Sequence, residues 1–165
     1  MESPSTYLLG DEMSTGHEVA MALRGAYWAL HRQTDACLQP LGVTANQFVL
    51  LGLLAQEDRV TQRKLVERAS SDQNTVRAML VALEAKGLVA RKRHPTDGRA
   101  WSVTLTTEGR RTFKKLWAKT EACRDRLAAA LGPGEPEALL ELLGRVSRAM
   151  EPRRRALTSA AGTRR

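Results

Sequence analysis

The sequence predicts a mainly α-helical fold with a small β-wing: a winged helix-turn-helix with additional N- and C-terminal helices that form a dimerisation region. Two short helical patterns are joined by a tight turn near residues 70–72, as in a helix-turn-helix. After Gly87 the hydrophobic period changes from the helical repeat to a two-residue repeat, which indicates a hairpin. Long amphipathic patterns precede and follow this segment.

The chain has the length and composition of one folded domain. It has 165 residues, of which 42% are hydrophobic, enough for a core. We expect a loose start at 1–13, one domain at 14–150 and a basic tail at 151–165. Within the domain, the winged helix-turn-helix is expected at about 44–106, and the dimerisation helices at about 16–38 and 107–150.

The first helix is expected over about residues 16–38. Thr15 and Glu18 stand in the T-x-x-E pattern of a capping box. Pro40 and Gly42 end the helix. One face carries apolar residues at helical spacing: Val19, Leu23, Ala26, Tyr27 and Leu30.

Two shorter helices follow, each with a threonine at its start. Thr44 and Gln47 form a second capping box, which opens a helix that runs to about Gln56. Thr61 is suited to cap a helix of about 62–69. The latter is the first helix of the predicted helix-turn-helix.

The second helix of the motif is expected over about 72–86 and ends at Gly87. Val76, Leu80 and Leu83 recur at i, i+4 and i+7 and form its buried face. The opposite face carries Asn74, Arg77, Ala78 and Val81. A polar outer face at the start of this helix is typical of DNA recognition.

Two strands are predicted at 88–93 and 99–105, the second with alternating apolar residues. Between them, His94-Pro95-Thr96-Asp97-Gly98 contains the proline and the Asp-Gly pair of a turn. The two strands and their turn form the predicted wing.

Long helices are predicted again after the wing. Thr106 caps a helix of about 107–131, Gly132-Pro133-Gly134 breaks it, and a last helix covers about 135–150. A second copy of the chain is the simplest partner for their apolar stripes. A two-fold dimer would present two recognition helices about 34 Å apart, one turn of a DNA duplex. The stripes contain Leu116, Leu127, Leu131, Leu139, Leu142, Leu143 and Val146.

The net charge of +8 is concentrated in the predicted DNA-binding segment. Residues 61–115 contain 13 basic and 5 acidic residues, whereas residues 1–60 contain 3 basic and 7 acidic ones. Basic residues that served solubility alone would be distributed more evenly along the chain, so we expect a polyanion-binding surface. A second basic block, with 7 basic residues and 1 acidic residue, lies at 145–165.

Several classes of protein are excluded by the sequence. The longest apolar run, Phe48 to Ala55, is far shorter than the roughly 20 residues of a membrane span. The polar start of the chain does not resemble a signal peptide, so we expect a soluble, cytoplasmic protein. No phosphate-binding glycine loop, G-x-S-x-G or H-E-x-x-H motif occurs, so we expect no enzyme and no cofactor.

Metal binding is not expected either. His17 and His31 share a helix face but lie about four turns apart, too far to hold one ion. Cys37 and Cys123 are 86 positions apart, which excludes a paired zinc clamp and a C-x-x-C motif. Their thiols are expected to be reduced.

These features resemble the multiple antibiotic resistance regulator (MarR) family of bacterial transcription factors. The resemblance covers about residues 16–150, and its most specific part is an Asp-x-Arg at the hairpin tip followed by a strand ending Leu-Thr-x-x-Gly. It implies a homodimer that binds a palindromic operator in double-stranded DNA and is displaced by a small ligand or by oxidation. The segments that carry it are LGVTANQFVLLGLL (41–54), VTQRKLVERASSDQNTVRAMLVALEAKGLVARKR (60–93) and DGRAWSVTLTTEGR (97–110).

The residues expected to contact DNA fall into three groups. The start of the recognition helix offers amides and a guanidinium that suit base edges in the major groove. The wing arginines suit a minor groove of about 6 Å, and the preceding helix suits phosphates. By resemblance, Asp97 braces the turn and Arg99 reaches the groove. The groups are Gln73, Asn74, Thr75 and Arg77; Arg91, Arg93, Asp97 and Arg99; and Arg63 and Lys64.

A ligand site is predicted less specifically than the DNA interface. Family members hold small aromatic or phenolic ligands between the dimerisation helices and the DNA-binding part. The corresponding residues here are Trp28, His31, Arg32, Phe48 and Trp117, each of which is also suited to a core position. Three alternatives remain open: a redox-responsive regulator that uses Cys37 or Cys123, a protein-interaction module, and a DNA-binding module without sequence preference.

Overall fold

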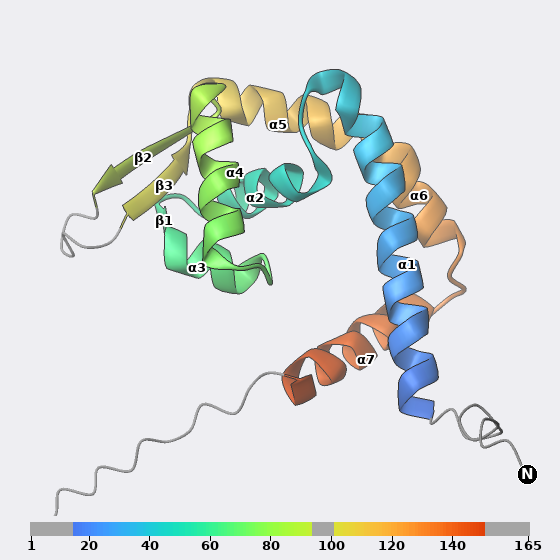
Figure 1. The fold of residues 1–165 in the computed structure, drawn as a ribbon. Coiled ribbons are helices and arrows are strands. Elements are labelled where there is room, and N and C mark those ends of the chain that lie inside the picture. The colour runs from blue at the N-terminus through green and yellow to red at the C-terminus, as the bar shows by residue number, and fades with distance from the viewer. Residues whose placement is uncertain (1–14, 94–100, 151–165) are drawn as a thin grey trace, which may run out of the picture. The chain divides into compact units, whose positions relative to one another are not determined.

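The computed structural model describes residues 15–93 and 101–150, which form helices and one small sheet (Figure 1). The chain divides into two compact units, the first ending at Arg124 and the second beginning at Asp125. The first unit contains the predicted winged helix-turn-helix. Thr15, the predicted N-cap of the first helix, is instead the first residue of α1, so the N-cap position lies outside the described residues.

The N-terminal helices have the predicted boundaries to within one residue. Helix α1 spans Thr15–Leu38 and leads into the 3₁₀ turn η1, Gln39–Leu41. Gly42 then adopts a left-handed φ of 68° that favours glycine. Helix α2 spans Ala45–Gln56 and carries the predicted capping box, because the Thr44 hydroxyl accepts from Gln47 and the Gln47 side chain accepts from Thr44.

The helix-turn-helix consists of α3, Gln62–Arg68, and α4, Gln73–Ala85. Thr61 caps α3 by accepting from the Lys64 amide, as predicted. Asp72 caps α4 by accepting from the Thr75 amide. The sequence pattern therefore places both helix starts correctly.

The wing belongs to a sheet of three strands rather than two. Strands β2, Val89–Arg93, and β3, Trp101–Leu105, pair antiparallel as predicted. A third strand, β1, Val60–Thr61, pairs with the other side of β3, so the order is β1-β3-β2. Two residues are too short for a recognisable alternation, which is why the sequence did not reveal β1.

One hydrophobic core holds α2, α4 and the sheet together. Leu50, Leu51 and Leu54 of α2 are completely buried, as are Leu80 and Leu83 of α4. The inward face of the sheet contributes Val60, Val89, Val103 and Leu105. The recognition helix and the wing therefore share one rigid base.

The prediction of one continuous helix over 107–131 is wrong in one respect. The helix divides at Thr120 into α5, Thr107–Lys119, and α6, Glu121–Ala129. The Thr120 hydroxyl donates to the carbonyls of Leu116 and Trp117, and the Arg124 guanidinium also donates to the Trp117 carbonyl. Side-chain donors thus satisfy the Trp117 carbonyl, which would accept from a backbone amide in a continuous helix. A second correction concerns Leu116, which is completely buried in the core and is not part of an exposed stripe.

The second unit contains α7, Glu135–Met150, with the predicted boundaries. Its apolar residues are exposed, with Leu140 at 71% and Leu142 at 53%. On α1 the predicted apolar face is exposed as well, at Val19, Tyr27 and Leu30.

In the described part of the chain, no single helix is long and apolar enough to cross a membrane. One pair of described helices, Thr15–Leu41 and Ala45–Gln56, has the length and apolar composition of a span only when both are counted together, and it is bent by 84°.

Candidate nucleic-acid interface

The first turns of α4 present a polar face to the surroundings. Val76, Leu80 and Leu83 point into the core, so the opposite face is exposed. The Thr75 hydroxyl donates to the Asp72 carboxylate, which also accepts from the Thr75 amide. The hydrogen bond from the Thr75 hydroxyl is the main cause of a lowered pKa of Asp72, and the bond from the Thr75 amide lowers it further. The N-cap carboxylate therefore stays ionised. The exposed residues on this face include Gln73, Asn74, Thr75, Arg77 and Ala78.

The basic residues of α3 lie in ion pairs on the protein surface. Lys64 Nζ contacts both carboxylate oxygens of Glu57 at 2.7 and 2.8 Å, and Arg68 contacts the same carboxylate at 3.2 Å. The hydrogen bond from Lys64 is the main cause of a lowered pKa of Glu57. Arg63 pairs with Glu67 at 3.3 Å and keeps 79% of its side chain exposed. Exposed pairs of this kind contribute little stability, so their cations remain available to another anion.

Arg91, a predicted wing residue, is held by the recognition helix. Its guanidinium contacts Glu84 Oε2 through Nε at 2.7 Å and through Nη2 at 2.5 Å, and its backbone amide donates to Glu84 Oε1. The hydrogen bond and charge of Arg91 lower the pKa of Glu84. The pair therefore fastens β2 to α4, a link that sequence analysis did not identify. The only sign of this link in the sequence is that an acidic residue precedes Gly87 and a basic residue follows it.

Trp101 is a second residue that sequence analysis did not assign to the site. It lies opposite Arg93 in the β2–β3 register. The guanidinium of Arg93 is 5.3 Å from the centre of its ring and that of Arg91 is 5.9 Å away, within the range of cation–π attraction. Trp101 therefore restrains both arginines at the described end of the wing.

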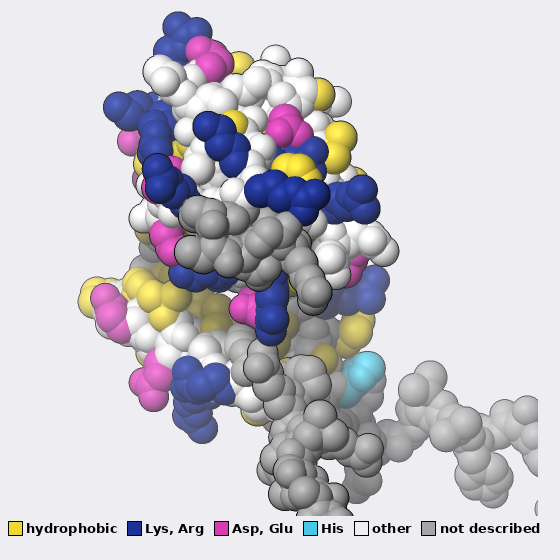
Figure 2. Space-filling model, turned by 90° about the vertical axis from the view of Figure 1, so that its left-hand side faces the viewer, with side chains coloured by type: hydrophobic (Ala, Val, Ile, Leu, Met, Phe, Trp, Pro, Cys, Tyr) yellow, Lys and Arg dark blue, Asp and Glu magenta, His cyan; other side chains and the backbone are white. Residues whose placement is uncertain are grey.

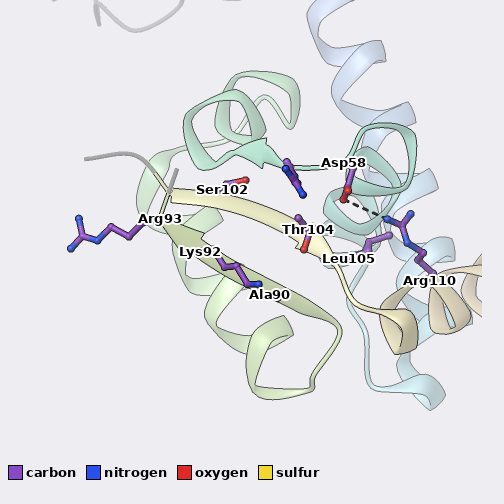
Figure 3. Close-up of a pocket in the computed structure, with 9 residues that line it drawn as sticks. Asp58, Ala90, Lys92, Arg93, Ser102, Thr104, Leu105 and Arg110 are labelled. Atoms are coloured by element: carbon purple, nitrogen blue, oxygen red, sulfur yellow. Dashed lines mark hydrogen bonds and ion pairs between the residues drawn. The ribbon is translucent and has the colours of Figure 1, made fainter. Parts of the chain in front are cut away.

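The outer face of the sheet forms a shallow pocket of about 360 Å³ (Figure 3). Ala90, Lys92 and Thr104 line it from the strands, and Asp58 and Arg110 lie at its edge in an ion pair of 3.4 Å. In Figure 3 the Arg93 side chain extends beyond the end of its strand, away from this pair. The remaining lining residues are Arg59, Ser102 and Leu105.

Basic side chains gather on the face of the molecule at which the described ends of β2 and β3 lie (Figure 2). Among the basic residues of α3, α4 and β2, the exposed ones include Arg63, Lys64, Arg77, Lys92 and Arg93. The positive charge that is concentrated in residues 61–115 of the sequence thus lies on the surface of the molecule. The predicted contacts Asp97 and Arg99 lie outside the described residues.

The five predicted ligand residues fall into separate groups. Trp28 and His31 pack against each other and against Tyr27 on α1. Phe48 of α2 instead lies 6.3 Å from Trp117 of α5, between ring centres, with Phe113 against both.

Arg32, the fifth predicted ligand residue, lines a pocket of about 500 Å³ where α1 meets α2. Within that pocket Asp35 accepts from the Ala45 amide, and its other oxygen lies 3.3 Å from His31. Asp35 thereby fixes the start of α2. The described residues contain no group of three or more His, Cys, Asp or Glu side chains that could hold a metal ion.

An exposed polar helix face beside a basic wing, both on one core, defines the class of winged-helix DNA-binding regulators. The family model described as the MarR family matches residues 43–101. The HTH-type transcriptional repressor Rv2887 of Mycobacterium tuberculosis is 35% identical over 118 residues, which cover 70% of this chain and 85% of that protein. The chain belongs to the MarR family and is a transcriptional regulator, not an enzyme.

Solved structures agree with this assignment. The transcriptional repressor CouR bound to a 23-mer DNA duplex is 30% identical with a TM-score of 0.72, and the match covers 84% of this chain and all of that one. BpsR of Bordetella bronchiseptica, whose DNA binding is regulated by 6-hydroxynicotinic acid, is 28% identical with a TM-score of 0.74. That match covers 83% of this chain and 98% of the BpsR chain.

Proposed function

We propose that the chain is a homodimeric repressor that binds a palindromic operator and is released by a small aromatic acid. The exposed polar face at the start of α4 carries this proposal. An interface for a protein partner would present large apolar residues there, whereas this helix begins with Gln73, Asn74 and Thr75, all exposed. A regulator of this kind acts where the DNA is, so we place it in the cytoplasm.

Each group of residues has a separate task in this proposal. Gln73, Asn74 and Arg77 read base edges in the major groove, where amides suit adenine and arginine suits guanine. Arg63 and Lys64 bind phosphates and supply affinity without sequence preference. Arg93 and Arg99 enter the minor groove, and Asp97 braces the turn between them.

Arg91 acts on the DNA indirectly in this proposal. Its guanidinium is engaged by Glu84 and lies near Trp101, so it fixes the distance between the wing and the recognition helix. We therefore describe Arg91 as a positioning residue.

The dimer is supported by apolar side chains that are exposed among the described residues. α7 exposes Leu140, Leu142 and Met150, the last at 75%. A monomeric soluble protein rarely leaves such a run of apolar side chains in water. A second copy would bury these side chains, and two-fold symmetry would explain a palindromic operator.

Ligand release is supported by the likeness to BpsR and by the pocket beside Arg32. A guanidinium at the rim of a concave site suits the carboxylate of an aromatic acid. Bound there, a ligand would contact both α1 and the turn that leads into α2, and α2 packs on α4 in the core.

The test is fluorescence anisotropy with the DNA upstream of the chain's own gene and with a scrambled duplex. We expect the upstream DNA to bind at least about a thousandfold more tightly, and Arg77→Ala to lose most of that preference. Lys119→Ala, which removes an exposed cation at the end of α5, is the matched control and should retain the preference. Equal affinity of the wild-type protein for both duplexes would reject the repressor in favour of a non-specific module. Addition of 6-hydroxynicotinic acid and related acids tests release.

A further inference from the structure

Two cysteines that lie far apart in the sequence meet in the folded chain. Cys37 Sγ and Cys123 Sγ are 3.4 Å apart, although 86 positions separate them. Both thiols are half-buried. The proposed DNA-binding and ligand sites use neither residue.

Both cysteines are held by well-fixed backbone. Cys37 lies in the last turn of α1, directly before Leu38, which is completely buried. Cys123 lies in the first turn of α6, where its amide donates to the Thr120 carbonyl. The next residue, Arg124, donates to Thr120 and lies 3.8 Å from the centre of the Trp117 ring. The two cysteines thus lie on helical turns that packing and hydrogen bonds hold in place.

Simple packing of two small side chains does not account fully for this contact. A hydrogen bond between thiols is weak and contributes little to stability. Structural cysteines are usually fully buried, whereas these two keep partial access to solvent, which oxidants require. A disulfide needs a sulfur separation of about 2.05 Å, so the pair is close to bonding distance without being bonded.

We propose that Cys37 and Cys123 form a peroxide-responsive dithiol that closes to an intrachain disulfide and thereby weakens operator binding. One thiolate attacks the O–O bond of a hydroperoxide, which gives a sulfenic acid and releases an alcohol, or water from hydrogen peroxide. The second thiol then attacks the sulfenic sulfur, forms the S–S bond and releases water. In sum, two thiols lose two hydrogen atoms and two electrons, and the hydroperoxide is reduced.

The bond would join two elements that matter for DNA binding. The end of α1 leads through η1 directly into α2, and α2 packs on α4 in the core. Closing the sulfurs by more than an ångström pulls on this connection at the point where α6 begins. Packed helices respond to such shifts by moving as rigid bodies, so the recognition helices of a dimer would leave the spacing that DNA requires. This effect on affinity rests on the proposed function, whereas formation of the bond does not.

The bond is tested on the reduced full-length protein treated with hydrogen peroxide or cumene hydroperoxide. We expect the intact mass to fall by two hydrogen atoms and a tryptic digest to contain one linked peptide with both cysteines. On a non-reducing gel the product should run as a monomer. Disulfide-linked dimers, or sulfinic acids without a link, would overturn the proposal. Because the wild-type chain is used, the result does not depend on whether a cysteine variant folds.

The variants Cys37→Ser and Cys123→Ser test the order of steps and the control of DNA binding. Neither should form the linked peptide, and in one of them a sulfenic acid should be trapped by dimedone. In the wild type, peroxide should weaken binding to DNA that the reduced protein recognises by at least about fivefold, and dithiothreitol should restore it. Both variants should lack this reversible loss. A disulfide that forms without any change in affinity would overturn the regulatory part of the proposal. Failure of the reduced protein to bind any DNA would instead reject the proposed function.

Discussion

The carbonyl oxygen of Leu88 lies 1.9 Å from the position that a Cβ on residue 109 would occupy. Only glycine fits here, at the point where α5 begins beside the start of β2. The Thr106 hydroxyl completes the junction, since it donates to the Gly87 carbonyl at 2.6 Å and accepts from the Gly109 amide at 2.9 Å. The Leu-Thr-x-x-Gly pattern is therefore the joint between the wing and α5.

Gly109→Ala should destabilise the protein markedly, because the new methyl group would collide with backbone that cannot rotate away. We expect a loss of about 2 kcal/mol or more in the free energy of unfolding, measured by urea denaturation. The matched control is Gly25→Ala in the middle of α1, where a Cβ would meet nothing within 4 Å. That change should be neutral or raise stability by up to about 1 kcal/mol. Equal effects of the two substitutions would contradict the close contact.

The Glu84–Arg91 pair should make stability depend on acid pH. Because Arg91 lowers the pKa of Glu84 below its ordinary value of 4.5, the unfolded chain binds a proton there more readily than the folded chain. The stabilisation is therefore complete above about pH 4.5 and is lost as the pH falls through the folded-state pKa. Glu84 is half-exposed, so the contribution should not exceed about 1 kcal/mol.

A double-mutant cycle with Glu84→Gln and Arg91→Gln measures that contribution. The coupling energy should be present at pH 7 and smaller at pH 3. The other carboxylates with lowered pKa values, Glu57, Asp72 and Glu108, cancel in the cycle because all four proteins contain them. A coupling energy that stays constant between the two pH values would refute the ionic character of the link.

A substitution in the same pair tests whether Arg91 positions the wing or contacts DNA directly. Removing a negative charge near the interface should strengthen binding to a polyanion if only long-range charge matters. If Arg91 acts by fastening β2 to α4, Glu84→Gln should instead weaken operator binding, since it loosens the wing. The sign of the change in affinity, measured at fixed salt, decides between the two roles.

The elements that were predicted from the sequence are those determined by residues close together along the chain. Thr44 with Gln47 marks the start of α2, and the alternation from Trp101 to Leu105 marks β3, because capping and strand periodicity are written within a few positions. The features that it missed arise when distant segments meet. Strand β1 exists only because Val60 and Thr61 pair with β3. The break at Thr120 depends on side chains that compete for the carbonyls of the preceding turn.

The candidate site shows the same division. The exposed face of α4 followed from the helical period, which places its polar residues opposite Leu80 and Leu83. In contrast, no local pattern pairs Glu84 with Arg91 or Cys37 with Cys123, because the turn at Gly87 and the whole first unit must form before these atoms approach.

Phosphate contact and base readout should differ in their dependence on salt. Lys64→Ala removes a cation proposed to contact phosphate, so affinity should fall alike for operator and scrambled DNA. The slope of log K against log salt should also become shallower by about 1. Its matched variant, Glu57→Gln, removes the partner of Lys64 and should raise affinity for both duplexes. A loss confined to the operator would contradict the phosphate role.

The proposed dimer predicts that the apolar face of α7 controls the oligomeric state. Leu142 is 53% exposed in the single chain, and burying a leucine contributes about 2 kcal/mol. In a two-fold dimer each substitution acts twice, so Leu142→Asp should weaken association by about a thousandfold or more. Glu141→Ala, one position away on α7, is the control and should leave association unchanged.

Analytical ultracentrifugation over a range of concentrations measures this effect, and circular dichroism checks that both variants keep their helices. We expect the Leu142→Asp chain to sediment as a monomer and to lose affinity for a full palindrome while it retains weak binding to a half-site. The half-site result follows because the polar face of α4 and the wing are both built within the first unit. A variant that remains dimeric with normal operator affinity would show that α7 does not form the interface.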